Sequence, residues 1–127
     1  MNSRVLLIED DRLLRDVYVE MLTYEGFAVE TAADGEDGLA KILAGGWDLI
    51  LLDIMLPKKD GLTILLDLKT QKPKNPNGPI ILLTALADDR TIKLGLANGA
   101  AGYIIKSSMP LAEKMDEIKA LMEQNKT

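Results

Sequence analysis

Hydrophobic residues along this chain form short continuous runs that alternate with longer segments of helical periodicity. The runs at residues 5–8, 49–52 and 80–83 contain only Val, Leu and Ile, and weaker runs of similar length lie at 28–32 and 102–105. Short apolar runs that are bounded by polar or turn residues are typical of buried strands. The pattern therefore predicts five strands.

The segments between and after these runs carry apolar residues at the three- to four-residue spacing of an amphipathic helix. The predicted helices span residues 12–25, 35–43, 62–69, 89–97 and 111–123. In the first of them the predicted apolar face is formed by Leu14, Val17, Met21 and Leu22. Asp11 precedes this helix, and a short acidic side chain at that position is a favourable N-cap.

The regular alternation of strands and helices predicts the fold class. Parallel strands joined by right-handed helical crossovers give this order of elements. Three of the runs are apolar on both faces, as is expected where helices cover both sides of a sheet. We therefore expect a doubly wound α/β sandwich of three layers with a five-stranded parallel sheet. A chain of 127 residues fits one domain, so residues 1–127 are predicted to form a single unit.

Composition excludes several kinds of chemistry. The chain has no Cys and no His, which removes disulfides, thiolate or imidazole metal sites and every catalytic triad that needs those side chains. Its net charge of −5 argues against direct nucleic-acid binding, because phosphate backbones attract basic surfaces. The sequence shows neither a signal peptide nor an apolar run near the ~20 residues of a membrane span. A cytoplasmic protein that does not bind membranes is the resulting expectation.

Polar residues follow four of the predicted strands. In an open parallel sheet the binding site lies at the carboxyl ends of the strands. Those positions hold Glu9 and Asp10, then Asp53, Thr84 and Lys106. Each residue alone has an ordinary structural interpretation, such as a helix cap, a turn former or a surface lysine. Their convergence at one edge of the sheet instead indicates a site.

The chemistry of this set points to a metal ion and a phosphoryl group. Close carboxylates repel one another, and a hard divalent cation with oxygen ligands relieves that repulsion. Mg²⁺ fits best, because carboxylates, water and phosphate oxygens commonly hold it. Without His or Cys, a carboxylate beside the metal is the most plausible nucleophile, and it would form an aspartyl phosphate.

Four motifs carry a resemblance to a known family. They are VLLIEDD at residues 5–11, DIMLPKKDG at 53–61, LTA at 83–85 and NGAAGYIIK at 98–106. Together they cover essentially the whole chain, in an order and spacing that resemble the receiver domains of bacterial two-component response regulators, the CheY-like superfamily. The resemblance implies a flavodoxin-like fold of five strands in the order 2-1-3-4-5.

The resemblance also implies a role for each matching residue. Asp53 would be the phosphoacceptor. Mg²⁺ would be held directly by Asp10, through water by Glu9, and by Asp53 and the backbone carbonyl of Met55. Thr84 and Lys106 would contact the phosphoryl group.

Three further positions would control the state of the switch. Tyr103 would turn inward when Thr84 moves toward the phosphoryl group. Met55 and Leu86 would flank the path of the attacking water. Neither side chain can orient a water strongly, so slow self-dephosphorylation is expected.

The implied function is a phosphorylation-dependent signalling switch. The phosphoryl group would come from a sensor histidine kinase or a histidine phosphotransfer protein. The surface of residues 89–97, 102–105 and 111–123 would then change its binding to a downstream protein or a C-terminal output domain. Such a domain is not an enzyme beyond Mg²⁺-dependent self-phosphorylation and self-dephosphorylation.

Two alternatives are a phosphorylation-independent docking module and a small phosphotransfer enzyme. The first would be favoured by loss of a key site residue, and none is lost. The second lacks support, because the chain has neither a P-loop nor a GxGxxG motif after its first strand. A phosphatase of the haloacid dehalogenase type would need a second Asp where Met55 stands.

One departure from the receiver-domain family is Ser107, which replaces the usual Pro after Lys106 and favours a trans peptide bond there.

Overall fold

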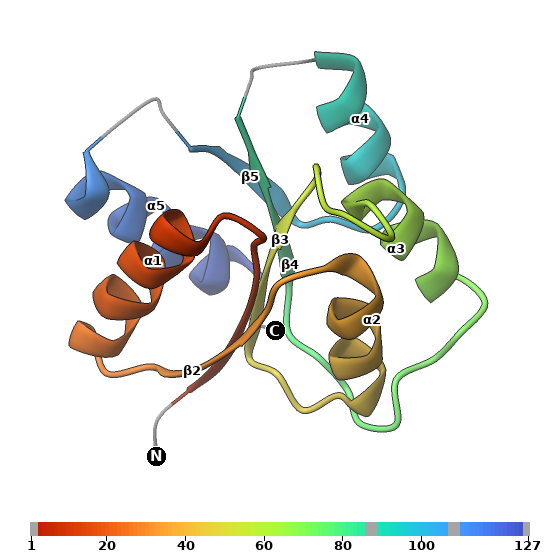
Figure 1. Cartoon of the computed structure of the whole chain (residues 1–127), viewed down its shortest axis with the longest axis horizontal. Helices are drawn as coiled ribbons and strands as arrows, with labels where there is room; N and C mark the ends of the chain where they lie inside the picture. The colour runs from red at the N-terminus through yellow and green to blue at the C-terminus, as the bar shows by residue number, and fades with distance from the viewer. Residues whose placement is uncertain (1–2, 86–88, 107–109, 126–127) are drawn as a thin grey trace.

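The computed structural model describes residues 3–85, 89–106 and 110–125, which form alternating strands and helices (Figure 1). The elements are β1 (Arg4–Ile8), α1 (Arg12–Tyr24), β2 (Ala28–Ala32), α2 (Gly35–Ala44), β3 (Leu49–Asp53), α3 (Gly61–Leu68), β4 (Ile80–Thr84), α4 (Asp89–Ala97), β5 (Gly102–Ile105) and α5 (Leu111–Gln124). All strand pairs are parallel, in the order β2-β1-β3-β4-β5. The predicted fold class and strand order are confirmed.

The helices divide between the two faces of the sheet, with α1 and α5 on one side and α2, α3 and α4 on the other (Figure 1). Alternate residues of the central strands therefore enter two separate hydrophobic clusters. One cluster joins the sheet to α2 and α3, and the other joins it to α1 and α5. β3 is buried along its whole length, whereas the edge strand β2 alternates between exposed and partly buried residues up to Ala32, which is buried. The carboxyl ends of the central strands are thus held in a rigid frame.

The boundaries of the elements lie within two residues of the predicted ones. Asp53 and Thr84, predicted to follow their strands, are the last residues of β3 and β4. Asp11 caps α1 as predicted, because its Oδ1 accepts a hydrogen bond from the backbone N–H of Leu14 at 3.2 Å. Among the helices that the structure describes, none combines the length and apolar character needed to cross a membrane.

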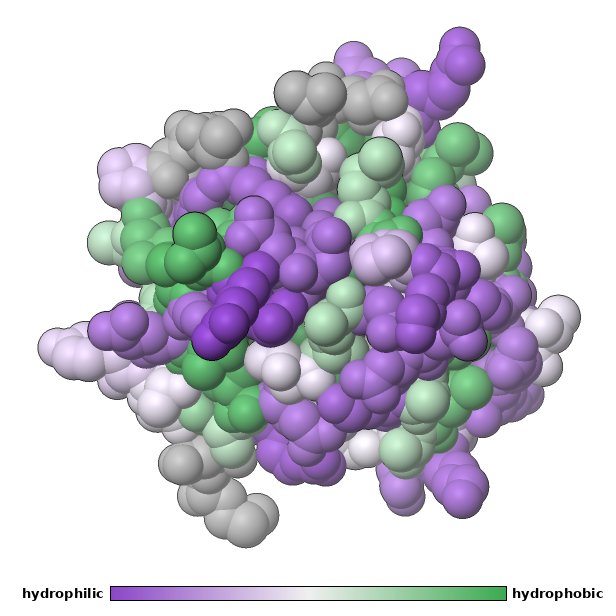
Figure 2. Space-filling model, in the orientation of Figure 1, coloured by the Kyte–Doolittle hydropathy of each residue, from purple (hydrophilic) through white to green (hydrophobic). Residues whose placement is uncertain are grey.

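The buried face of α1 differs from the predicted one at one position. Val17 is 42% exposed, whereas Tyr18 is completely buried. The other three predicted residues, Leu14, Met21 and Leu22, belong to or pack against the cluster that joins the sheet to α1 and α5. Leu13, on the same helix, is more exposed still. Figure 2 shows hydrophobic side chains among hydrophilic ones on the surface of this part of the molecule. The prediction was wrong for Val17, because the neighbouring Tyr18, which the apolar spacing did not include, takes the place in the core.

Contacts with the start of α2 hold the loop between β3 and α3 in place. The backbone N–H of Gly35 donates to the carbonyl oxygen of Pro57 at 3.1 Å. A Cβ atom on Gly35 would overlap the carbonyl group of Lys59. Lys58 has a positive φ of 69°, and its ammonium lies 3.6 Å from Oδ2 of Asp34. The loop that follows Asp53 is therefore positioned by α2.

The substitution Gly35→Ala is expected to lower the free energy of unfolding by more than about 2 kcal/mol, because the new methyl group has no room against a backbone carbonyl. Gly26→Ala is the control. Its methyl group would meet no atom within 4 Å, but its φ of +94° disfavours a side chain, so a loss of about 1 kcal/mol is expected. Urea denaturation of both variants measures the difference. Equal losses would show that the contact with Lys59 relaxes without cost.

Candidate functional site

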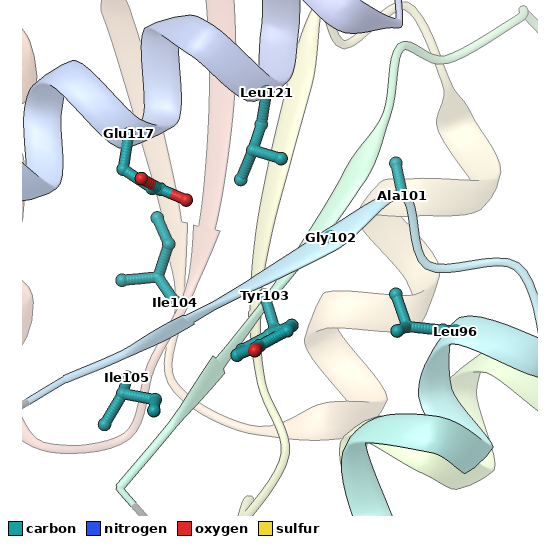
Figure 3. Close-up of a pocket in the computed structure, with 8 residues that line it drawn as sticks. All are labelled: Leu96, Ala101, Gly102, Tyr103, Ile104, Ile105, Glu117 and Leu121. Atoms are coloured by element: carbon teal, nitrogen blue, oxygen red, sulfur yellow. The ribbon is translucent and has the colours of Figure 1, made fainter. Parts of the chain in front are cut away.

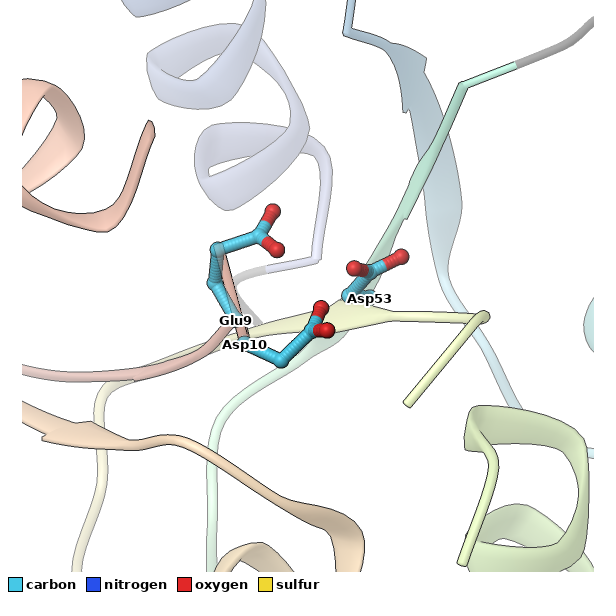
Figure 4. Close-up of side chains that lie close together, drawn as sticks. All are labelled: Glu9, Asp10 and Asp53. Carbon is cyan, nitrogen blue, oxygen red and sulfur yellow. The ribbon is translucent and has the colours of Figure 1, made fainter. Parts of the chain in front are cut away.

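Three carboxyl groups meet at the carboxyl ends of the neighbouring strands β1 and β3. Glu9 and Asp10 follow β1, and Asp53 ends β3. Carboxylate oxygens of the three residues all lie within 4.8 Å of one another, and Figure 4 shows the groups gathered at these strand ends. Glu9 and Asp53 are buried, and Asp10 is exposed. The cluster thus has an inner pair and one carboxylate that faces solvent.

Lys106 bridges the two buried carboxylates. Its ammonium nitrogen lies 2.6 Å from Oε1 of Glu9 and 2.7 Å from Oδ2 of Asp53. The backbone N–H of Lys106 also donates to the carbonyl oxygen of Thr84 at 2.8 Å, which fixes the end of β5 beside β4. The structure therefore brings Lys106 from β5 to the acids of β1 and β3, as the sequence predicted.

Backbone groups hold the carboxylates in place. The N–H of Met55 donates to Oδ1 of Asp53 at 3.1 Å, and the N–H of Asp11 donates to Oε2 of Glu9 at 3.1 Å. Arg15 donates through Nη1 to the backbone carbonyl of Glu9 at 2.9 Å. Sequence reasoning did not single out Arg15, although its position one turn into a helix that follows an acid pair was a signal.

The charged groups of the site are the carboxyl groups of Glu9, Asp10 and Asp53 and the ammonium group of Lys106. Burial raises the pKa of Glu9; the nearby ammonium of Lys106 opposes this shift, and Asp53 reinforces it. Burial alone would lower the pKa of Lys106, but its contacts with Asp53 and Glu9 raise it overall. Lys106 is thus a permanent cation at neutral pH. The carboxylates in excess of it are suitable oxygen ligands for a hard divalent cation.

Thr84 and Tyr103 lie on adjacent strands at different depths. Thr84 is buried at the end of β4, where its register partner on β5 is Ile105. Tyr103 is 40% exposed and faces a groove of about 420 Å³ between α4 and α5. Figure 3 shows Leu96 extending from α4 toward Tyr103, with Leu121 on α5 beyond β5. The arrangement places an exposed ring on the surface that was predicted to carry the signal.

The remaining predicted positions fall at the rim of the site or outside the described residues. Met55 follows β3 closely, and its side chain is 76% exposed. Leu86 and Ser107 lie outside the described residues, so the expected trans Lys106–Ser107 bond stays a prediction.

Comparison with known proteins identifies the family. The model of the response regulator receiver domain matches residues 5–119. The chain belongs to the response regulator receiver domains. As a receiver domain it is a phosphorylation-dependent signalling switch of two-component systems and not a classical enzyme. Neither alternative function is favoured by these similarities.

Relatives with the same domain are themselves regulators. The chain is 42% identical to the transcriptional regulatory protein DltR of Streptococcus agalactiae over 103 residues, which are 81% of this chain and 45% of DltR. It is 36% identical to the response regulator ArlR of Staphylococcus aureus over 122 residues, 96% of this chain and 53% of ArlR. The receiver domain thus spans about half the length of these two proteins.

A solved structure shares both the fold and the family. The response regulator TrrA of Thermotoga maritima, crystallised in complex with Mg²⁺-BeF, superposes with a TM-score of 0.77 at 32% identity. The match covers 94% of this receiver domain and 98% of TrrA.

Proposed function

We propose that residues 1–127 act in the cytoplasm as one receiver domain whose phosphoacceptor is Asp53. The observation that carries this assignment is the ammonium of Lys106, 2.7 Å from Oδ2 of a buried carboxylate at the end of the central strand. Asp10 lies beside it with its side chain open to solvent. This carboxylate combines a nucleophilic oxygen with a fixed cation, beside an acid that is exposed to solvent.

Mg²⁺ is the proposed metal, held by Glu9, Asp10, Asp53 and the backbone carbonyl of Met55. The donor set fits, because the three carboxylates supply hard oxygen ligands within 4.8 Å of one another. When bound, the metal would neutralise charge on the phosphoryl oxygens. The complex of the related TrrA with Mg²⁺-BeF supports this choice.

Phosphoryl transfer then follows from the residues of the site. A carboxylate oxygen of Asp53 attacks phosphorus, the bond between phosphorus and the donor's leaving group breaks, and the leaving group keeps the electron pair. Lys106 moves from Oδ2 to a phosphoryl oxygen and offsets its charge, and the hydroxyl of Thr84 donates to another. The products are an acyl phosphate on Asp53 and the free leaving group.

The proposed signal leaves through Thr84 and Tyr103. A Thr84 side chain that turns toward the phosphoryl group vacates space that the ring of Tyr103 fills, so phosphorylation favours a conformation that already exists. The groove between α4 and α5 loses its exposed ring in that state. The proposed donor is a sensor histidine kinase or a histidine phosphotransfer protein, and the receiver of the signal is a downstream protein or an output domain. The length of DltR and ArlR supports a role beside further domains.

Binding of beryllofluoride with Mg²⁺ tests this function. The expected result is a set of NMR shift changes that begin at Asp53 and extend through α4, β5 and α5. In Thr84→Ala the changes at the site should persist, whereas those at Tyr103 and in α5 should shrink. Changes that stay within the metal site of the wild type would contradict the switch.

The lifetime of the phosphorylated state is a separate prediction. Met55 and Leu86 are proposed to flank the water that attacks the acyl phosphate, so self-dephosphorylation is expected to be slow. Replacing them together, Met55→Asn with Leu86→Glu, should accelerate phosphate release about ten- to thirtyfold, or about 1–2 kcal/mol, because the new groups can orient the water. The matched control is Met55→Leu, which stays apolar. Release from the double variant at the wild-type rate would contradict the prediction.

A further inference from the structure

Two buried polar atoms lack a directed hydrogen bond within the part of the chain that the structure describes. They are Oε1 of Glu9 and the hydroxyl oxygen of Tyr18. Oε1 has only the ion pair with Lys106, whereas Oε2 of the same carboxylate accepts from the N–H of Asp11. One atom is an acceptor and the other carries a proton to donate. A buried polar group without a hydrogen-bond partner lowers the free energy of unfolding, so the presence of both atoms needs an explanation.

Tyr18 lies on the helix that begins beside the acid site. This helix, α1, starts just after the Glu9–Asp10 pair, and side chains on a helix lean toward the helix N-terminus. Burial, together with repulsion from the carboxylates of Glu9 and Asp53, raises the pKa of Tyr18 to about 12. The phenol is therefore protonated at neutral pH and can donate a hydrogen bond.

The ring of Tyr18 is fixed from the side of α5. The ammonium of Lys114, on a largely buried side chain, lies 5.8 Å from the centre of the ring. The ring belongs to the buried cluster that also contains residues of the sheet and of α5, including Leu83 and Met115. Its hydroxyl group has little freedom other than rotation of the O–H bond and small movements along the axis of the ring.

We propose that Tyr18 is a positioning residue whose hydroxyl donates to Oε1 of Glu9 when Lys106 leaves that oxygen for the phosphoryl group. This inference rests on the proposed function, because it needs Lys106 to change partners. In the unphosphorylated protein the ammonium neutralises Oε1. Once Lys106 turns away, Oε1 would stay buried with no partner on its side of the carboxylate. The Tyr18 hydroxyl, which has no other partner among the residues that the structure describes, then holds Glu9 in the orientation that the phosphorylated site requires.

The substitution Tyr18→Phe removes only the hydroxyl group, and Tyr24→Phe is the matched control, because Tyr24 lies on the same helix and is 90% exposed. Titration with beryllofluoride in excess Mg²⁺ should show an affinity about tenfold lower for Tyr18→Phe, or about 1.4 kcal/mol. Tyr24→Phe should bind like the wild type. Urea denaturation without metal should show Tyr18→Phe to be as stable as the wild type or more stable, which separates positioning from a structural role.

A second readout follows the phenol directly. With ¹³C label at the ζ carbon of tyrosine, the Tyr18 signal should move on addition of beryllofluoride and Mg²⁺, and its hydroxyl proton should exchange more slowly with water. The Tyr24 signal should stay in place. Equal affinity of Tyr18→Phe and wild type, or a Tyr18 signal that does not move while the wild type binds, would overturn the inference alone. A wild type that does not bind beryllofluoride would overturn the proposed function, and this inference with it.

Discussion

Asp53→Asn is expected to take up no phosphate from a small phosphodonor such as acetyl phosphate in the presence of Mg²⁺. The amide keeps the size of the side chain and can still contact Lys106, but it is a far poorer nucleophile than a carboxylate. Asp53 ends the buried strand β3 with the ammonium of Lys106 at 2.7 Å, and Glu9, the other carboxylate in contact with Lys106, is one of the proposed metal ligands. Intact-mass spectrometry after incubation with the donor measures the phosphorylated fraction.

A matched control for this experiment is Asp60→Asn. Asp60 lies in the loop between β3 and α3 and is exposed. It caps α3, because its Oδ1 accepts a hydrogen bond from the backbone N–H of Thr63 at 2.8 Å. Asparagine is an equally good cap, so the helix is preserved. This variant should be phosphorylated like the wild type. Phosphorylation of Asp53→Asn to the wild-type extent would show that another residue is the phosphoacceptor.

Asp10→Asn is expected to weaken Mg²⁺ binding by about 10- to 100-fold, or about 1.4–2.7 kcal/mol. Removing one charge from a group of three carboxylates loses attraction to the dication. The lower repulsion among the remaining carboxylates offsets part of that loss. Asp10 is the one exposed member of the cluster, so its carboxylate reaches the solvent side from which a metal enters. Isothermal titration calorimetry gives the affinity directly.

The adjacent Asp11 provides the control for the metal prediction. It carries the same charge one residue away, but its side chain caps α1 and is not part of the carboxylate cluster. Asp11→Asn keeps the cap. It should change the affinity for Mg²⁺ less than threefold, or by about 0.6 kcal/mol or less, because solvent and salt screen a charge that lies outside the cluster. An equal loss in both variants would mean that Asp10 acts only through overall charge. The same affinity in Asp10→Asn and wild type would exclude it as a ligand.

Much of the fold and the site could be predicted from the sequence. Continuous runs such as Leu49–Leu52 within β3 can be buried only in a sheet that is covered on both faces, so the architecture followed from hydrophobicity alone. The placement of Asp53 and Lys106 then followed, because the carboxyl ends of parallel strands share one edge. Neither conclusion needed the side-chain geometry.

The rest depends on how the elements pack together, which a local pattern does not contain. Tyr18 and Val17 are neighbours in sequence, and only the fit of α1 against α5 and the sheet decides that Tyr18 enters the core. The close approach of Gly35 and Lys59 joins the start of α2 to the loop before α3, and no local rule connects these two segments. The position of Arg15 one turn into α1 was a signal, but its acceptors, the backbone carbonyls of Glu9 and Asp10, could not be identified from residue type.

The ammonium of Lys106 gives this acidic site an internal counterion. A cluster of carboxylates open to water would attract mobile cations, and its affinity for Mg²⁺ would fall steeply with added salt. Here a cation attached to the chain, at 2.6 and 2.7 Å from the two buried carboxylates, balances one unit of their charge. Mobile cations therefore compete for a site whose net charge is smaller by one. Its affinity for Mg²⁺ should fall less steeply with added salt than that of three carboxylates without such a partner.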